Sequence, residues 1–361
     1  MTAGALRYGV IGCGMMGQEH LRNIALLPGA RVAAIVEPDA DMAAIAATLA
    51  PGAVLCPDLA ALLDIEGLDC LLIASPNHCH VAQLEEIARR RPLPVMVEKP
   101  LYISEAEAAR VAALDLPVWV AMEYRYMPAI ARFLDRIDAV TGGATMLTIR
   151  EHRFPFLPKV GGWNRFNRYT GGTLVEKCCH FFDLMRLALK SDPVRIMASG
   201  GQMVNHRAER YGDAVPDIWD SAYVIVDFAS GARAMLELCM YAEGSRFQED
   251  LSACGPAGRI EARVPGPARF WPPALGPSPL AEVEESPRQP PGPQVTRLPL
   301  DPALQAAGDH NGATFHQHRA FAEALRGRGP WSVSLSDGAW AVRMGLAAQR
   351  AVETGQVAYI H

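Results

Sequence analysis

The stretch LRYGVIGCGMMG, residues 6–17, decides the fold of the first part of this chain. Its apolar half, Leu6–Ile11, passes directly into a Gly-x-Gly-x-x-Gly pattern formed by Gly12, Gly14 and Gly17. Between a strand and a helix, this pattern predicts a loop for the pyrophosphate of a dinucleotide. The first glycine allows a tight turn, the second lets the backbone approach the phosphates, and the third lets helix and strand pack closely.

The helix expected after this loop begins at Met15 and Met16, so its N-terminal amides would face the phosphates. Twenty residues beyond Gly17, a second apolar run, Arg31–Val36, ends at Glu37. A carboxylate at this position can accept hydrogen bonds from the ribose hydroxyls of an adenosine. The sequence therefore predicts NAD as the cofactor, in preference to NADP. The alternative is a glycine-rich turn without a ligand, which the agreement of loop, acid spacing and position disfavours.

The chain has 361 residues, half of them hydrophobic, and a formal net charge of −5. This length predicts about two domains. Acidic and basic residues are interspersed, and the run Arg89–Arg91 is typical of a helix C-terminus, so no nucleic-acid partner is expected. No segment approaches the roughly 18 apolar residues of a membrane span, and no secretory leader pattern is visible. The eight cysteines form no Cys-x-x-Cys pair, which favours a reducing cytoplasm.

Short apolar runs alternate with helix-like stretches over the first 122 residues, and this alternation predicts a doubly wound parallel sheet. The strands expected after the first are 31–36, 54–55, 70–74, 95–97 and 118–121. We therefore assign residues 1–122 to an α/β Rossmann domain that binds NAD(P). Residues 123–361 are expected to form a substrate-binding and oligomerisation domain.

The second domain is predicted to be α+β, with a mostly antiparallel open sheet. After a helix at 128–137, the strand candidates are 144–152, 194–200, 221–228, 232–241 and 247–254. Helices or another subunit must cover one face of such a sheet, so a homo-oligomer, a dimer or tetramer through this sheet, is expected.

The end of the chain combines a proline-rich segment with two helices. The segment Pro265–Pro299 holds eleven of the 28 prolines, and we expect it to be a long irregular excursion. Helices are predicted over 314–325 and 336–354. These C-terminal helices could pack against the first domain.

Two polar segments follow the fourth and fifth expected strands. They are Ser75-Pro76-Asn77-His78-Cys79-His80 and Glu98-Lys99-Pro100. Ligands of open α/β sheets bind beyond the carboxyl ends of the strands, so both segments are expected near the dinucleotide. The alternatives are a helix cap for Asn77, a satisfied turn residue for His80 and a solvated surface position for Lys99.

A third segment, Gly171–Asp183, places Glu176, His180 and Asp183 on one face if it is helical from Thr173. Histidine exchanges protons readily near neutral pH, and a neighbouring carboxylate can orient it. The alternative is an ordinary helix with solvent-facing polar groups.

A metal site is not predicted. Glu176 and His180 could supply two ligands, and His310, His316 and His318 others, but these residues lack the short spacing of a structural zinc site. The adjacent Cys178 and Cys179 are typical of buried packing residues.

These segments, in this order, resemble the Gfo/Idh/MocA oxidoreductases, the family of glucose–fructose oxidoreductase and the inositol dehydrogenases. The resemblance covers most of the chain. It runs through residues 12–17, 76–80 and 98–100, then Arg125 and Pro128, 171–183 and 336–356.

The resemblance implies that Lys99 contacts the nicotinamide ribose and a substrate hydroxyl, and that His180 transfers the proton. One departure stands out: family members commonly have Asp four residues before this histidine and Gly two before it, where this chain has Glu176 and Cys178. Glu176 keeps the carboxylate but reaches one methylene further.

The expected function is hydride transfer between nicotinamide and a secondary alcohol of a sugar, sugar derivative or cyclitol. His180 would act as general base, oriented by Glu176, and Lys99 would stabilise the developing negative charge. Arg125 is also expected to contact the cofactor. The further residues expected to bind substrate hydroxyls are Tyr124, Trp163, Asn164, Arg165 and His310. Two alternatives are an NAD-retaining glycosidase or eliminase that oxidises its substrate transiently, and a non-catalytic nucleotide-sensing regulator.

Overall fold

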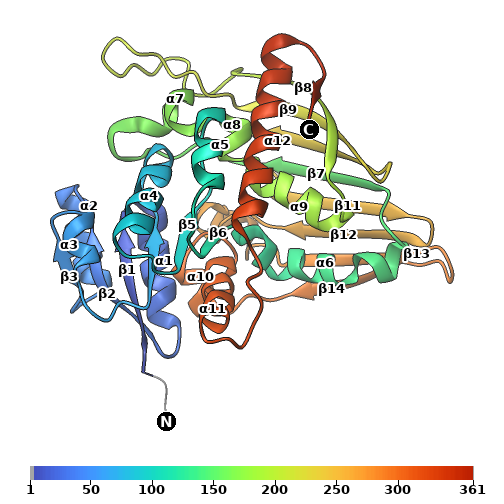
Figure 1. The fold of residues 1–361 in the computed structure, drawn as a ribbon. Coiled ribbons are helices and arrows are strands. Elements are labelled where there is room, and N and C mark those ends of the chain that lie inside the picture. The colour runs from blue at the N-terminus through green and yellow to red at the C-terminus, as the bar shows by residue number, and fades with distance from the viewer. Residues whose placement is uncertain (1–3, 361) are drawn as a thin grey trace.

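The computed structural model describes residues 4–360 and contains two β-sheets (Figure 1). In the figure, the sheet of the first part of the chain lies on the left and the second sheet on the right. The long helix α12, Leu335–Thr354, stands between them.

The first sheet is six-stranded and parallel, in the order β3-β2-β1-β4-β5-β6. Its strands are β1 Leu6–Ile11, β2 Ala30–Val36, β3 Val54–Cys56, β4 Cys70–Ile73, β5 Val95–Glu98 and β6 Val118–Ala121. The intervening helices are α1 Met15–Leu26, α2 Ala40–Leu49, α3 Leu59–Leu63, α4 His80–Arg90 and α5 Glu105–Ala112. Strands β4, β5 and β6 are buried at every position, which explains their continuous apolar sequence. The doubly wound parallel sheet is confirmed.

The second sheet has nine strands in the order β14-β13-β12-β11-β7-β10-β9-β8-β15. The strands are β7 Met146–His152, β8 Pro193–Gly201, β9 Ser221–Phe228, β10 Arg233–Cys239, β11 Glu249–Gly255, β12 Gly258–Val264, β13 Ala281–Pro287, β14 Gln294–Leu298 and β15 Ala358–Tyr359. Strands β7 and β10 pair in parallel, and the other neighbours are antiparallel. The mostly antiparallel sheet is therefore confirmed.

The expectation that residues 265–299 form an irregular excursion is wrong. This segment contains β13 and β14, which extend the sheet at one edge. Only Val283 of these strands is buried, and the charged residues around it conceal the strand pattern. Prolines are tolerated here because they occur at strand ends and in loops, where no ladder hydrogen bond is lost.

Helices cover one face of the second sheet and leave the other open. Helices α6, Pro128–Thr141, and α9, Cys179–Leu189, share a hydrophobic core with the inward residues of β7 and β9–β12. The outward residues include Met146, Tyr223 and Ile225, whose relative exposures are 57%, 59% and 43%. The covered face agrees with the sequence expectation, and the open face carries large apolar side chains.

The expected single helix from Thr173 is wrong, because the structure has two. Helix α8 spans Thr173–Glu176, and α9 begins only at Cys179. A two-residue turn, 177–178, separates the two helices.

Helix α12 joins the two parts of the molecule. A Cβ built on Gly338 would lie 2.7 Å from a Val120 methyl of β6, and one on Gly345 would lie 2.7 Å from the Leu174 carbonyl oxygen of α8. Helix α12 thus packs closely against both strand and helix. It begins in a capping box between Ser334 and Asp337.

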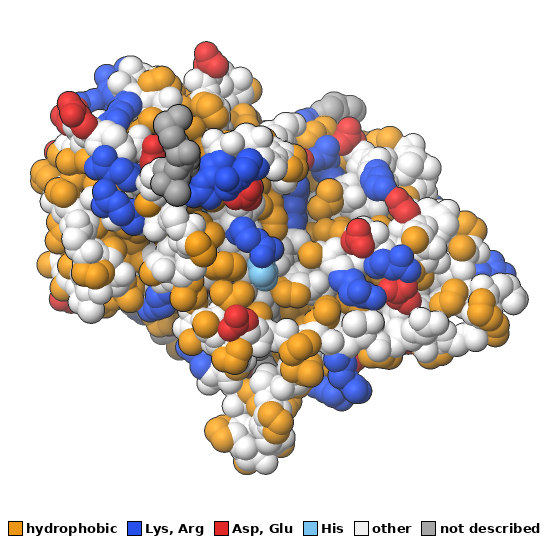
Figure 2. Space-filling model, turned by 90° about the horizontal axis from the view of Figure 1, so that it is seen from below, with side chains coloured by type: hydrophobic (Ala, Val, Ile, Leu, Met, Phe, Trp, Pro, Cys, Tyr) orange, Lys and Arg blue, Asp and Glu red, His pale blue; other side chains and the backbone are white. Residues whose placement is uncertain are grey.

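None of the helices within residues 4–360 is long and apolar enough to cross a membrane. On the face seen in Figure 2, positive and negative side chains are interspersed among hydrophobic ones. That distribution follows the mixed charge pattern of the sequence.

Candidate active site

The glycine loop between β1 and α1 is shaped by close backbone contacts. Gly12 has a φ of +89°, and a Cβ there would lie 2.6 Å from the Ser75 nitrogen. A Cβ on Gly17 would lie 2.3 Å from the Gly12 carbonyl oxygen. By contrast, a Cβ built on Gly14 would meet no described atom within 4 Å. The loop is therefore packed from below and open above Gly14, as a pyrophosphate site requires.

Glu37 is attached to this loop by its carboxylate. Its Oε2 accepts a hydrogen bond from the Cys13 amide at 2.5 Å, and its Oε1 accepts one from the Asp39 amide at 2.9 Å. A carboxylate has about four lone-pair sites, so both oxygens keep capacity for ribose hydroxyls. At the start of α1, Met15 is exposed and Met16 half-buried beside the open space.

The segment after β4 contains one buried polar group without a hydrogen-bond partner and one histidine whose ring nitrogens both have partners. Asn77 is buried, and its Nδ2 has no partner within the described chain. His80 is fully buried, with its nitrogens 2.9 Å and 3.0 Å from the carbonyl oxygens of Pro100 and Ser75. The structure thus places His80 as a tie between the loops after β4 and β5, and leaves Asn77 able to meet a ligand.

Glu98 and Lys99 extend from the end of β5 in different hydrogen-bond environments. Oε1 of Glu98 lies 2.8 Å from Nε2 of His20, whose Nδ1 lies 2.8 Å from Nε2 of His318. Nζ of Lys99 donates to the carbonyl oxygen of Glu176 at 3.1 Å. This bond connects the end of β5 to the end of α8.

The Lys99 ammonium is stabilised in its charged form. Burial by itself would lower its pKa, but Cys179, Glu176 and Glu98 outweigh that effect and raise the pKa above its ordinary value. Lys99 is therefore a cation at neutral pH, suited to stabilising negative charge and not to accepting a proton.

The surroundings of His180, unlike those of Lys99, favour the uncharged form of the side chain. Its side chain is 2% exposed and stacks on the ring of Tyr124, with centroids 4.1 Å apart and an interplanar angle of 7°. Burial, followed by the ammonium groups of Lys99 and Lys177, lowers its pKa well below the ordinary value. His180 is thus a neutral imidazole at neutral pH, and its Nδ1 has no hydrogen-bond partner among residues 4–360.

The carboxylate that pairs with His180 comes from Glu123, with 4.0 Å between Oε1 and Nε2. The carboxylate of Glu176 instead lies 3.4 Å from Nζ of Lys159. The break between α8 and α9 explains this difference, because an uninterrupted helix would have placed Glu176 and His180 one turn apart on one face. The expected pairing of Glu176 with His180 is not formed in the structure.

Asp183 and Arg125 form a nearly buried ion pair away from His180's own contacts. Nε and Nη2 of Arg125 donate to the two carboxylate oxygens of Asp183 at 2.6 Å and 2.5 Å, and Nη1 donates to the Ser332 carbonyl oxygen. The guanidinium thereby fastens the short helix η2, Glu123–Tyr126, to α9 and to the segment before α12. Its expected contact with the cofactor stays a prediction.

Among the expected substrate residues, Trp163 is partly exposed, whereas Asn164, Arg165 and Tyr124 are buried. Trp163 lies with its ring 4.3 Å from Nζ of Lys159, close to Glu176. Asn164 and Arg165 are buried and bound to other loops, through Leu157 and Glu209 respectively. Tyr124 is also buried, and its hydroxyl lies 2.5 Å from Nζ of Lys177. Tyr124 thus supports the His180 ring from behind.

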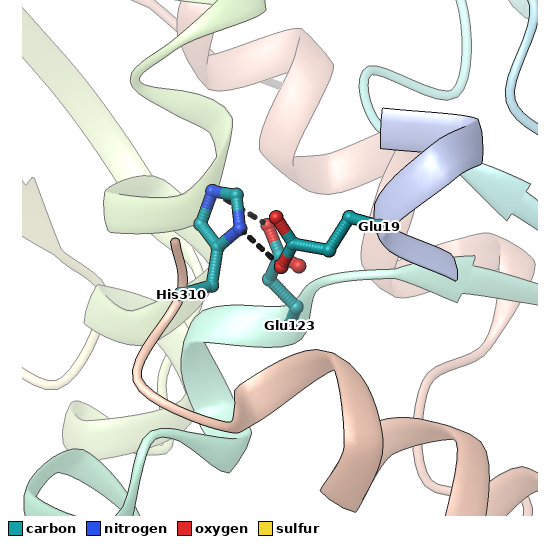
Figure 3. Close-up of side chains that lie close together, drawn as sticks. All are labelled: Glu19, Glu123 and His310. Carbon is teal, nitrogen blue, oxygen red and sulfur yellow. Dashed lines mark hydrogen bonds and ion pairs between the residues drawn. The ribbon is translucent and has the colours of Figure 1, made fainter. Parts of the chain in front are cut away.

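His310 lies beside two buried carboxylates, those of Glu19 and Glu123, which face the same side of its ring (Figure 3). Its Nδ1 is 2.8 Å from Oε1 of Glu19, and its Nε2 is 3.5 Å from Oε1 of Glu123. The hydroxyl of Thr314 lies 2.8 Å from Glu19 and 3.0 Å from Glu123. Glu19, Glu123 and His310 are ligand types for a divalent cation, and their ligand atoms lie within 4.8 Å of one another. Because these three residues are far apart in the sequence, no short ligand spacing points to this set.

The charge on His310 predicts a pH dependence of stability. Burial alone would lower the pKa, but Glu123 and Glu19 outweigh it and raise the His310 pKa from 6.5 to about 9. A pKa raised by folding contributes stability that is complete below pH 6.5 and is lost as the pH rises through about 9. We expect the melting temperature to fall over this interval by roughly 2–4 °C for each kcal/mol lost. Calorimetry at several pH values measures the fall; a His310→Gln variant with the same profile would contradict this assignment.

Four residues of the site were missed at the sequence level: Glu19, Glu123, Lys159 and Lys177. Glu123 directly follows strand β6, so the rule that selected the ends of β4 and β5 could have found it. Lys177 lies inside the segment 171–183 that the sequence singles out, whereas Glu19 and Lys159 carry no comparable signal. Glu19 faces His310 across 291 positions of sequence.

Comparison with known proteins agrees with this architecture. Residues 6–115 match the model of the Gfo/Idh/MocA family described as "Oxidoreductase family, NAD-binding Rossmann fold", and residues 140–360 match "Oxidoreductase family, C-terminal alpha/beta domain". The chain belongs to the Gfo/Idh/MocA oxidoreductase family. The predictions of the family, of the fold class and of an NAD-binding fold are confirmed.

One similar protein is the inositol 2-dehydrogenase of Leifsonia xyli subsp. xyli, 33% identical over 247 residues, which are 66% of this chain and 67% of that protein. A putative myo-inositol dehydrogenase from Sinorhizobium meliloti 1021 has a TM-score of 0.77 at 20% identity, covering 99% and 100% of the two chains. GenD2 from gentamicin A biosynthesis, solved in complex with NAD, also has a TM-score of 0.77 at 20% identity, covering 100% and 98%.

Proposed function

We propose that this oxidoreductase is an NAD-dependent dehydrogenase that acts on a secondary alcohol of a sugar, sugar derivative or cyclitol. The observation that carries the proposal is geometric: Nζ of Lys99 donates to the carbonyl oxygen of Glu176 at 3.1 Å, at the end of α8, and the buried His180 lies at the start of α9, the next helix. The positive charge of Lys99 is one cause of the lowered pKa of His180, after burial. Alcohol oxidation needs both groups, a base for the hydroxyl proton and a positive charge for the developing alkoxide. The inositol dehydrogenases among its relatives support the substrate class.

The residues around the glycine loop fit NAD. The open space above Gly14, the remaining lone pairs of Glu37 and the unpartnered amide of Asn77 offer complementary contacts to pyrophosphate, ribose and a polar cofactor group. When bound, NAD supplies the hydride acceptor. The protein's own residues orient the alcohol, hold the charge and take up the proton.

We assign the roles as follows. His180 accepts the hydroxyl proton, and Lys99 stabilises the oxygen that loses it. Glu176 receives Lys99 at its backbone oxygen and Lys159 at its carboxylate, so it positions both ammonium groups. The ring of Trp163 offers an apolar surface for the carbon face of the substrate ring.

We extend the proposal to the roles of the two domains and to the assembly of subunits. Residues 1–122 bind the cofactor, and residues 123–361 bind the substrate. The open sheet face carrying Met146, Tyr223 and Ile225 is the expected contact in a homodimer or tetramer. Sedimentation equilibrium of the purified protein measures the size of that assembly.

The test is an assay of the purified protein with NAD, and in parallel NADP, against inositols, aldoses, uronates and glycosides. The absorbance of the reduced cofactor reports turnover. Reduction with any member supports the proposal and identifies the hydroxyl pattern. The proposal would be contradicted if the protein binds NAD, as measured by thermal shift, but reduces neither cofactor with any of these alcohols.

A Glu37→Ser variant tests cofactor choice. The carboxylate repels a 2'-phosphate, so its removal is expected to raise kcat/KM with NADP by roughly tenfold or more and to weaken the use of NAD. Glu37→Gln is the matched control for size without charge. Unchanged cofactor preference in both variants would remove Glu37 from this role.

A further inference from the structure

One oxygen of Glu123 lies between two imidazole rings. Oε1 is 4.0 Å from Nε2 of His180 and 3.5 Å from Nε2 of His310. The side chains of Glu123 and His180 are 1% and 2% exposed, whereas that of His310 is 23% exposed. The three groups thus form a path from the buried base to a ring that contacts solvent.

Alcohol oxidation makes such a path necessary. Each turnover leaves one proton on His180, which is buried and faces the positive charges of Lys99 and Lys177. These surroundings disfavour an imidazolium, so the proton needs an acceptor close by. Glu123 is suited to this task because burial raises its pKa above that of an ordinary carboxyl.

The neighbours of the path fix its geometry. The stacked ring of Tyr124 sets the plane of His180, and Oε1 of Glu19 holds Nδ1 of His310 at 2.8 Å. The Thr314 hydroxyl lies 3.0 Å from Oε2 of Glu123, so the other oxygen, Oε1, is the one that faces both histidines. At 4.0 Å, Oε1 of Glu123 is not hydrogen-bonded to Nε2 of His180, so proton transfer between them requires a movement that shortens this distance.

We propose that Glu123 and His310 form a proton relay that carries the substrate's hydroxyl proton from His180 to solvent. The relay rests on the proposed dehydrogenase function. The O–H bond of the alcohol breaks as an N–H bond forms at Nε2 of His180, and that proton then moves to Oε1 of Glu123. His310, an imidazolium whose Nδ1 is held by Glu19, gives the proton at Nε2 to water and regains one at the same nitrogen from Oε1 of Glu123. Both electrons leave the carbinol carbon with the hydride to nicotinamide, so the relay moves one proton and no electrons.

The test follows proton release and NAD reduction together by stopped flow, using a pH indicator in weak buffer and the absorbance of the reduced cofactor. In the unmodified protein the two traces are expected to coincide. In Glu123→Gln and His310→Gln, proton release should lag behind NAD reduction, and kcat should fall by roughly 10²-fold with little change in KM for NAD. A high concentration of imidazole buffer should restore much of the loss, because it offers a substitute acceptor.

Two further variants sharpen the result. Glu123→Asp keeps the acceptor one methylene shorter and is expected to retain more activity than Glu123→Gln. The control is His152→Gln, since His152 also pairs with a carboxylate, Glu237 at 2.8 Å, but lies on β7 away from His180. Its two traces should match those of the unmodified protein.

Three outcomes would overturn the relay: coincident traces in Glu123→Gln and His310→Gln, a loss of kcat that buffer does not restore, or turnover that requires a divalent cation and stops with EDTA. The last would mean that Glu19, Glu123 and His310 hold a metal ion. Failure of the unmodified protein to reduce NAD would appear before any variant is compared, and it would contradict the proposed function itself.

Discussion

Replacement of His180 by alanine is expected to lower kcat by about 10²- to 10⁴-fold, the range that a positioned proton-transfer group contributes. The affinity for NAD should stay within about twofold, because the contacts of the glycine loop and Glu37 do not involve this ring. Steady-state kinetics and NAD titration by fluorescence measure the two quantities.

His180→Gln is the matched variant, since it fills more of the space beside Tyr124 but cannot act as a base. Equal losses in both variants would assign the effect to proton transfer and not to a cavity. Near-normal turnover in His180→Gln would move the base to another group, with Lys99 the next candidate.

Replacement of Lys99 by methionine is expected to lower kcat by about 10²- to 10³-fold, as removal of one oxyanion-stabilising donor does. Methionine retains most of the apolar length of the side chain but carries no charge and cannot bind the Glu176 carbonyl oxygen. The loss should be the same at every pH at which His180 is neutral. Kinetics from pH 6 to 9 test this, and Lys99→Arg, which keeps the charge, should be less impaired.

If the acidic limb of the pH profile, where activity rises as an essential base loses its proton, disappears in Lys99→Met, the electrostatic role is contradicted. Such a loss would show that the titrating group of the unmodified protein is the lysine itself. The raised pKa of Lys99 argues against that outcome.

The first sheet could be predicted from sequence because β4, β5 and β6 are buried at every position, β1 is buried over most of its length, and the strands end at turn residues. The runs 6–11 and 118–121 coincide with β1 and β6. Strand β13 and the edge strand β14 were hidden, since they bury little and mix charged with apolar residues. Edge strands of this composition resist pairing with other chains, and the same property removes the hydrophobic pattern.

The candidate site was predictable where a side chain follows a strand, as Lys99 does, or lies in a motif, as His180 does. The partners of these residues were not. Glu176 and His180 are four apart in sequence, and only the break after α8 separates them. Glu123 and His310 meet because the loop before α11, Ala313–Leu325, packs on α1 and η2, a contact that no local pattern encodes.

The position of α12 has a consequence for biosynthesis. Residues 338 and 345 brace β6 against α8, and α8 presents the carbonyl oxygen that receives Lys99. A nascent chain lacks this brace until the last helix has left the ribosome. Contacts between such distant segments form slowly. A transcript cut short before residue 335 would encode a chain without this brace and without Ala341 and Val342, which belong to the core of the first sheet, so we expect that chain to be unstable and to lack a complete site.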